Sequence, residues 1–219
     1  MGRARDTRPA VPPPVRGWLG PIGALAALAV LVLGVRYAGH GRPGAADAWV
    51  QSAAEGVRPR WRRLALATDF LGEPLGAAML LAAVVTVCLL LRRPRAAVLA
   101  VAGTGLAVGA TKLIKPLVGR TIHDGHLSYP SGHTAFLTAL ALVVALLLAG
   151  RLGLGRTAGA LLVLGAALAA GAAMGWAQVV LGAHYPTDAL GGWCTALAVV
   201  PATAWLVGRT TGAGRRERR

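Results

Sequence analysis

Charged side chains and cysteines are both scarce in this sequence. Asp, Glu, Lys and Arg make up 14% of the 219 residues, whereas hydrophobic residues make up 55% and the mean hydropathy is +0.59. A soluble domain of this size has no use for so much apolar surface, so the composition indicates a membrane protein. The two cysteines, Cys88 and Cys194, form no zinc-type pattern and lie inside apolar runs, where a thiol behaves as a small hydrophobic group. We predict no redox role for them, no metal site and no cofactor.

Positive charge is abundant, but its position argues against nucleic acid as a partner. A net charge of +15 suits a protein that neutralises phosphates along a nucleic acid. Most of this charge lies at the ends of apolar segments and in two tails, residues 1–17 and 209–219. We expect the first tail and residues 212–219 to be disordered, and both tails to contact anionic lipid head groups. Membrane lipids are therefore the expected partners.

Long apolar runs dominate the rest of the chain. Six of them approach the roughly 20 residues that a membrane-spanning helix needs. They cover residues 18–36, 74–91, 96–114, 133–150, 157–176 and 187–207. We predict an all-α, multi-pass helical bundle of about six transmembrane helices, with one membrane-embedded domain over residues 18–208.

Alternate loops of this bundle differ in charge, which predicts its orientation. One set of loops, which includes both tails, holds 14 Arg against two acids, and the other set holds nine Lys or Arg against six acids. Loops that remain in the cytoplasm carry the excess of Lys and Arg. We therefore expect both termini in the cytoplasm, and the second set of loops outside the cell membrane. Segment 39–73 belongs to this second set, and its mixture of Trp and Arg fits either an interfacial amphipathic helix or a solvated loop.

Two polar islands interrupt the apolar pattern, Tyr129–His133 and His184–Asp188, and each opens an apolar run. Two spans separate them, so the chain crosses the membrane and returns, and both islands face outward. In the first island, Ser131, Gly132 and His133 stand where a helix begins and where free backbone N–H groups favour an anion.

The only two lysines, Lys112 and Lys115, lie three residues apart at the end of the preceding run and lead towards Arg120. Basic residues at this depth either extend to the membrane surface for structural reasons or bind a ligand. Together with the hydroxyl, the free amides and the histidine of the first island, they indicate a phosphate site.

The second island supplies a reactive pair. His184 and Asp188 are four residues apart around Pro186, which is tolerated in a first helical turn. A carboxylate in this position holds the imidazole tautomer and makes the other ring nitrogen a better nucleophile or base. A structural hydrogen bond is the alternative interpretation of the pair alone.

Taken together, the islands resemble the type 2 phosphatidic acid phosphatase family, integral-membrane lipid phosphate phosphatases related to vanadium haloperoxidases. The resemblance covers residues 64–207 and is strongest at Tyr129–Thr134 and Leu181–Asp188, whose histidines are 51 positions apart. It implies a phosphatase that needs no metal and acts on an isoprenoid phosphate or diphosphate, such as undecaprenyl diphosphate, or on a phosphatidate.

The resemblance also implies residue roles. His184 attacks phosphorus and forms a phosphohistidine, Asp188 orients it, and His133 protonates the leaving oxygen. The phosphoryl oxygens are bound by a set that comprises Lys115, Arg120, Ser131 and Gly132, with Lys112 and Gln178 as further candidates.

Two motif arginines of the family are displaced or replaced. Counted from Lys115, the arginine of the first motif falls on Ile122, and the arginine ahead of the third motif falls on Gln178. These departures favour altered substrate choice, or a non-catalytic relative that binds anionic lipid. A third hypothesis is a metal site in the loop His123–His126, whose residue types suit a divalent cation; a short polar loop explains it more simply.

Overall fold

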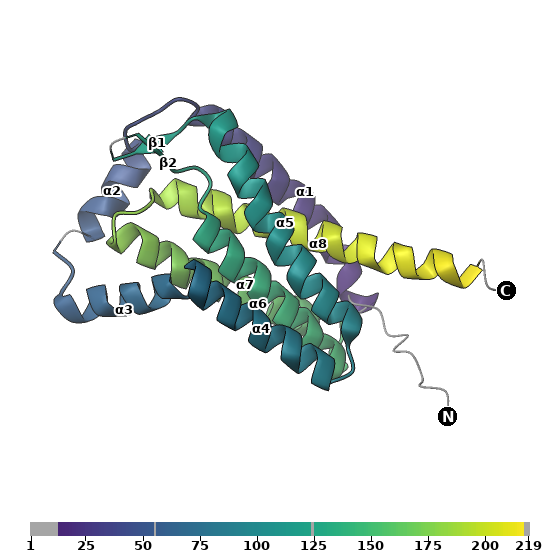
Figure 1. Cartoon of the computed structure of the whole chain (residues 1–219). Helices are drawn as coiled ribbons and strands as arrows, with labels where there is room; N and C mark the ends of the chain where they lie inside the picture. Colours follow the sequence, from purple (N-terminus) through teal and green to yellow (C-terminus); the bar gives the residue numbers. More distant parts are fainter. Residues whose placement is uncertain (1–12, 55, 124, 217–219) are drawn as a thin grey trace.

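The computed structural model describes residues 13–54, 56–123 and 125–216, without the side chains of 13–16 and 210–216. Within these residues the chain is a helical bundle with one small hairpin (Figure 1). The elements are α1 (Pro13–Arg36), α2 (Ala45–Ala54), α3 (Pro59–Phe70), α4 (Pro74–Leu90), α5 (Pro94–Val118), β1 (Thr121–Ile122), β2 (His126–Leu127), α6 (Gly132–Arg151), α7 (Arg156–Val180) and α8 (Pro186–Arg216). The strands pair antiparallel, with Ile122 opposite His126.

Proline and glycine set several helix ends. Helices α3, α4 and α5 begin with Pro59, Pro74 and Pro94, whose fixed φ and missing N–H suit the first helical position. Helix α5 ends at Gly119, which has φ of 63° and adopts the left-handed conformation that stops a helix. This stop turns the chain into the hairpin that carries it towards the first polar island.

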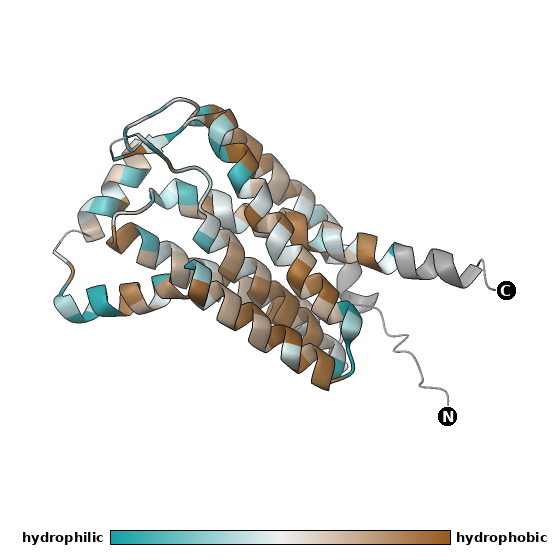
Figure 2. Cartoon of the chain, viewed as in Figure 1, coloured by the Kyte–Doolittle hydropathy of each residue, from teal (hydrophilic) through white to brown (hydrophobic). Residues whose placement is uncertain are grey.

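Helix α6 forms the centre of the bundle and packs against α5, α7 and α8. The most apolar window of α6 is 61% buried, whereas that of α1 is 22% buried. Leu142, Val143 and Leu146 of α6 belong to a core that also contains Val163 of α7 and Val200 of α8. Figure 2 shows the apolar residues along the helices and many hydrophilic ones at the end where α2 and the hairpin lie. The outer helices thus leave an apolar surface for lipid.

The predicted fold class is confirmed. In the part of the chain that the structure describes, five helices are long and apolar enough to cross a membrane, and α3 with α4, bent by 61° at their junction, makes a sixth if the bent pair is one span. The predicted run 74–91 is α4, which has only 17 residues and is long enough to cross a membrane only together with α3. The protein is a multi-pass membrane protein, while the outward orientation stays a prediction.

The segments outside the predicted spans are largely helical, which is the first of the two alternatives for segment 39–73. Segment 39–73 contains α2 and α3. Residues 1–12 of the predicted tail lie outside the described residues, and α1 already begins at Pro13. Helix α8 continues to Arg216, so residues 212–216 of the predicted tail 209–219 are helical and the expectation of disorder there is wrong.

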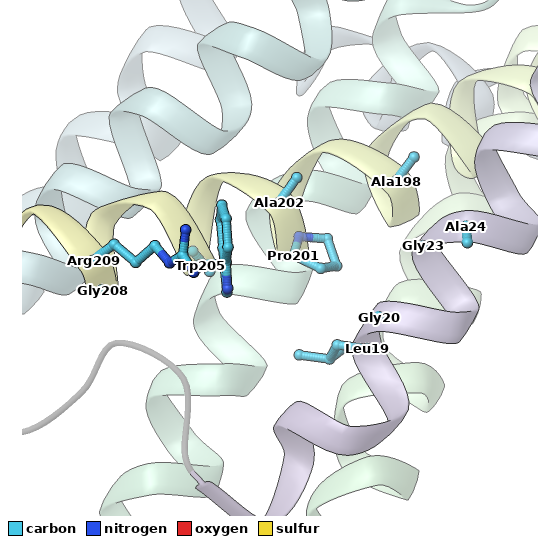
Figure 3. Close-up of a pocket in the computed structure, with 11 residues that line it drawn as sticks. Leu19, Gly20, Gly23, Ala24, Ala198, Pro201, Ala202, Trp205, Gly208 and Arg209 are labelled. Atoms are coloured by element: carbon cyan, nitrogen blue, oxygen red, sulfur yellow. The ribbon is translucent and has the colours of Figure 1, made fainter.

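A groove of about 510 Å³ lies between α1 and α8, with Leu19, Pro201, Trp205 and Arg209 among its lining residues (Figure 3). The Arg209 guanidinium lies 4.0 Å from the centre of the Trp205 ring. Trp205 lies nineteen positions after the start of α8 at Pro186, which corresponds to roughly 28 Å along a helix. This groove is therefore remote from both polar islands.

Candidate active site

The two polar islands lie against each other. The backbone N–H of Ser131 donates to the backbone oxygen of Asp188 over 2.9 Å. The contact depends on glycines in α8: a Cβ on Gly192 would lie 2.2 Å from the Ser131 oxygen, and a Cβ on Gly191 would lie 2.4 Å from the Tyr129 ring. The start of α6 and the start of α8 therefore share one site.

His184 is held just ahead of α8. Its Nδ1 lies 3.6 Å from Oδ2 of Asp188, and the same oxygen accepts a 3.1 Å hydrogen bond from the backbone N–H of Tyr185. The Nδ1 distance is slightly longer than a hydrogen bond, as is common for catalytic pairs without substrate. With Nδ1 facing the carboxylate, Nε2 is the nitrogen available for reaction.

Burial favours the neutral form of His184. Desolvation lowers the pKa of His184, the nearby Asp188 carboxylate opposes this, and the positive charge of Lys115 lowers the pKa further. A neutral imidazole has a free electron pair, so the burial prepares His184 to act as a nucleophile.

Arg120 does not occupy the position that the sequence predicted. Its side chain is completely buried, its Nη2 donates to Oδ2 of Asp47 over 2.6 Å, and its Nη1 donates to Oδ1 of Asp188 over 2.6 Å. Nη1 also donates to the Thr187 hydroxyl over 2.6 Å. Two carboxylates neutralise the guanidinium, which has no exposed surface with which to reach a phosphate.

Two tyrosine rings enclose this buried arginine. The Arg120 guanidinium carbon lies 4.0 Å from the Tyr37 ring centre and 4.4 Å from the Tyr185 ring centre. Asp47 further accepts hydrogen bonds from the backbone N–H and the hydroxyl of Thr187, each over 2.9 Å. Arg120 and Asp47 thus join α2 to the start of α8 and fix Asp188, which corrects the prediction of a phosphate-binding Arg120.

His133 has a different environment, made by the turn between α3 and α4. Its Nε2 lies 3.5 Å from Oε1 of Glu73 and 3.8 Å from Oδ1 of Asp69. Gly72 allows this approach, because a Cβ there would lie 2.3 Å from Cδ2 of His133. His133 is therefore bordered by two carboxylates that the sequence did not place at the site.

Gln178 also differs from its predicted role. Its side chain is 1% exposed, and its amide nitrogen donates to Oδ1 of Asp69 and to the Met174 sulfur. The amide nitrogen binds a carboxylate, where the prediction expected a phosphate.

The remaining candidates divide into two groups. Lys115 is half-buried and its Nζ donates to the backbone oxygens of Leu127 and Ser128, over 2.8 and 3.3 Å. Ser131 is fully buried and caps α6, and Gly132 begins that helix, so the free N–H groups lie at the site as predicted. Lys112 is exposed. Lys115 and the start of α6 are thus the groups best placed for a phosphate.

The comparisons with known proteins agree with this geometry. The model of the PAP2 superfamily matches residues 75–211. The chain belongs to the PAP2 superfamily. Its fold is similar to the crystal structure of a transmembrane PAP2-type phosphatidylglycerolphosphate phosphatase from Bacillus subtilis, with a TM-score of 0.68 and 22% identity over 87% of this chain and 96% of that one. No curated protein matches the sequence.

One group of side chains at the PAP2 site could hold a metal ion. Ligand atoms of Asp69, Glu73 and His133 lie within 4.8 Å of one another. The loop proposed from the sequence is less suited: Nε2 of His123 bonds to the Gly182 backbone oxygen over 2.8 Å, His126 is exposed, and Asp124 lies outside the described residues.

Sequence reasoning missed three residues of the PAP2 site: Asp47, Asp69 and Glu73. All three belong to the six acids counted in the outward loops, so their side of the membrane was predicted. One signal in the sequence pointed to these acids. Arg120 is displaced from the position of the motif arginine and Gln178 replaces one, which indicates that each binds a group other than the phosphate.

Proposed function

We propose that this protein is a membrane lipid phosphatase that hydrolyses a phosphomonoester or diphosphate through a phosphohistidine intermediate. The observation that carries the proposal is the buried His184–Asp188 pair at the start of α8, held against the Ser131–His133 start of α6 inside a membrane bundle. Membership of the PAP2 superfamily supports the same reaction.

The proposed reaction has two steps. In the first, Nε2 of His184 forms a bond to phosphorus, the bond to the leaving oxygen breaks, and His133 donates a proton to that oxygen. In the second, water attacks phosphorus, the P–N bond breaks, and His133 takes the proton of the water. Asp188 stabilises the positive charge that develops on His184. Lys115 and the N–H groups at the start of α6 stabilise the phosphoryl oxygens.

A lipid substrate is supported by a second groove, of about 490 Å³, between α2, α7 and α8. It is almost entirely apolar and reaches Pro186 and Ala189, in the first turn of α8 beside His184. Val50, Trp176, Val179, Leu190 and Trp193 are among the residues that line it. We propose that it takes an acyl or prenyl chain while the phosphate lies at the histidines, on the outer face of the cell membrane that the loop charges predict.

The test is a phosphate-release screen over polyprenyl diphosphates, polyprenyl phosphates and phosphatidates, with and without chelator. We expect release from at least one class, insensitivity to chelator and inhibition by vanadate. His184→Ala should abolish release, and His40→Ala, a change of the same type at an exposed position, should not. No release from any substrate, together with lipid binding that survives His184→Ala, would support the non-catalytic alternative.

A further inference from the structure

The turn between α3 and α4 brings two carboxylates to His133 as well as packing against its ring. Asp69 lies in the last turn of α3 and Glu73 precedes α4, and both carboxylates face the same nitrogen of His133. We propose that Asp69 is a positioning residue for His133 as the proton donor to the leaving oxygen, and that Gln178 holds Asp69 for this role. This inference rests on the proposed phosphatase function.

The two carboxylates lie within ion-pair distance of His133 but beyond hydrogen-bond distance. At 3.8 and 3.5 Å, Asp69 and Glu73 are too far from Nε2 of His133 for a hydrogen bond, and this buried nitrogen has no hydrogen-bond partner among the described residues. When the ring is protonated, it is attracted to both carboxylates. A carboxylate beside an imidazole also sets the orientation of the ring and the nitrogen that carries the proton.

Asp69 is better fixed than Glu73. The Asp69 side chain is 21% exposed, whereas that of Glu73 is 51% exposed. Water screens the more exposed carboxylate, and the longer Glu side chain loses more rotamer freedom when it is held. Asp69 has in addition the Gln178 amide as a buried partner. The stronger and more directed influence on His133 therefore comes from Asp69.

A neutral donor at position 178 fits this role. An arginine there would pair with Asp69 and neutralise the charge that His133 needs nearby. The Gln178 amide orients the carboxylate by a hydrogen bond and leaves its negative charge intact. Gln178, which replaces the motif arginine, and Asp69 thus act together to position His133.

The test uses the dependence on the leaving group. A proton donor matters when the leaving group is a poor one, such as the alcohol of octyl phosphate, and matters little for the nitrophenol of p-nitrophenyl phosphate. We expect Asp69→Asn to lower kcat on octyl phosphate by roughly ten- to hundredfold and kcat on p-nitrophenyl phosphate by less than about threefold, with KM changed by less than about twofold on either. Asp69→Glu, which retains the charge, should recover most of the octyl phosphate activity.

Two further variants complete the design. Glu73→Gln tests which carboxylate dominates: we expect a selective loss on octyl phosphate that is smaller than that of Asp69→Asn, and an equal or larger loss would overturn the assignment to Asp69. Gln178→Met should lower the octyl phosphate rate selectively, and its effect should not add to that of Asp69→Asn, because both act through one contact. If Asp69→Asn fails to fold, Gln178→Met and Asp69→Glu decide the question by the same substrate ratio.

Equal losses on both substrates, or no loss on octyl phosphate, would overturn the positioning role. Loss of wild-type activity on chelation would overturn it too, by making Asp69, Glu73 and His133 metal ligands. Failure of the proposed function has a different signature: no phosphate release by the wild type, or full activity in His184→Ala.

Discussion

The two histidines of the site have opposite surroundings. His184 faces a completely buried set in which Asp188, Arg120 and Asp47 are joined by contacts of 2.6 Å between tyrosine rings. The His133 side chain is 28% exposed and is bordered by carboxylates on a turn, at 3.5 and 3.8 Å. The nucleophile side is fixed by many contacts, and the acid side by few.

This difference follows from what each side must accommodate. A nucleophile must meet phosphorus along one line, and a rigid support keeps that geometry. A proton donor must meet a leaving oxygen that carries a lipid, so its side of the site has to stay open. The 61° bend between α3 and α4 places the Asp69–Glu73 turn at that open side.

The largest loss of activity should come from removing the negative charge of Asp188 beside the nucleophile His184. We expect Asp188→Asn to lower kcat by about a thousandfold or more, because the amide holds neither the tautomer nor the charge of His184 and leaves Arg120 with one carboxylate. Initial rates with p-nitrophenyl phosphate measure this, with thermal unfolding in detergent as the control. If kcat of the folded Asp188→Asn variant falls less than tenfold, the rigid support of His184 is not what distinguishes it from His133.

Next in size is a loss of stability. Asp47→Asn leaves the buried Arg120 with one anionic partner, and breaking a buried ion pair in this way costs about 3 kcal/mol or more. We expect a clearly lower unfolding temperature and a vanadate affinity that changes by less than about twofold. The reverse pattern, unchanged stability with weakened vanadate binding, would return Arg120 to the phosphate site.

The open side should respond to steric displacement. In Gly72→Ala the new methyl group meets the His133 ring, whose Cδ2 lies 2.3 Å from that position, and a shift of the donor by about an ångström lowers the rate by roughly ten- to hundredfold. Gly105→Ala in α5 is the matched control, since nothing lies within 4 Å of its Cβ. Equal rates for the two variants, measured on octyl phosphate, would show that the turn does not position His133.

The smallest effect is a displacement of the pH profile. Because burial lowers the pKa of His184, the neutral nucleophile persists below the ordinary value of 6.5, and kcat/KM should fall only as the pH drops through that lowered pKa. The same sign applies to stability: the unfolded chain binds the proton more readily, so His184 makes the fold less stable as the pH falls below 6.5. An acid limb of kcat/KM at or above 6.5 would contradict the assignment.

The parts of this molecule that could be predicted from the sequence are local in the chain. A spanning helix is visible as an apolar run, and His184 meets Asp188 because the carboxylate in the first turn of α8 turns back towards the residue just ahead of the helix. The partners of Arg120 and Gln178 could not be predicted, because Asp47 and Asp69 lie 73 and 109 positions away and reach the site through tertiary packing. The sequence therefore assigned both residues to the phosphate.

The most direct test of the central claim is to trap the phosphoenzyme. The purified protein is mixed with a labelled phosphate ester, quenched in alkali, in which phosphohistidine survives, and digested for mass spectrometry. We predict phosphate on His184 in the wild type and in Asp69→Asn, and no phosphohistidine in His184→Ala. Phosphate on another side chain, or full turnover in His184→Ala, would contradict the account.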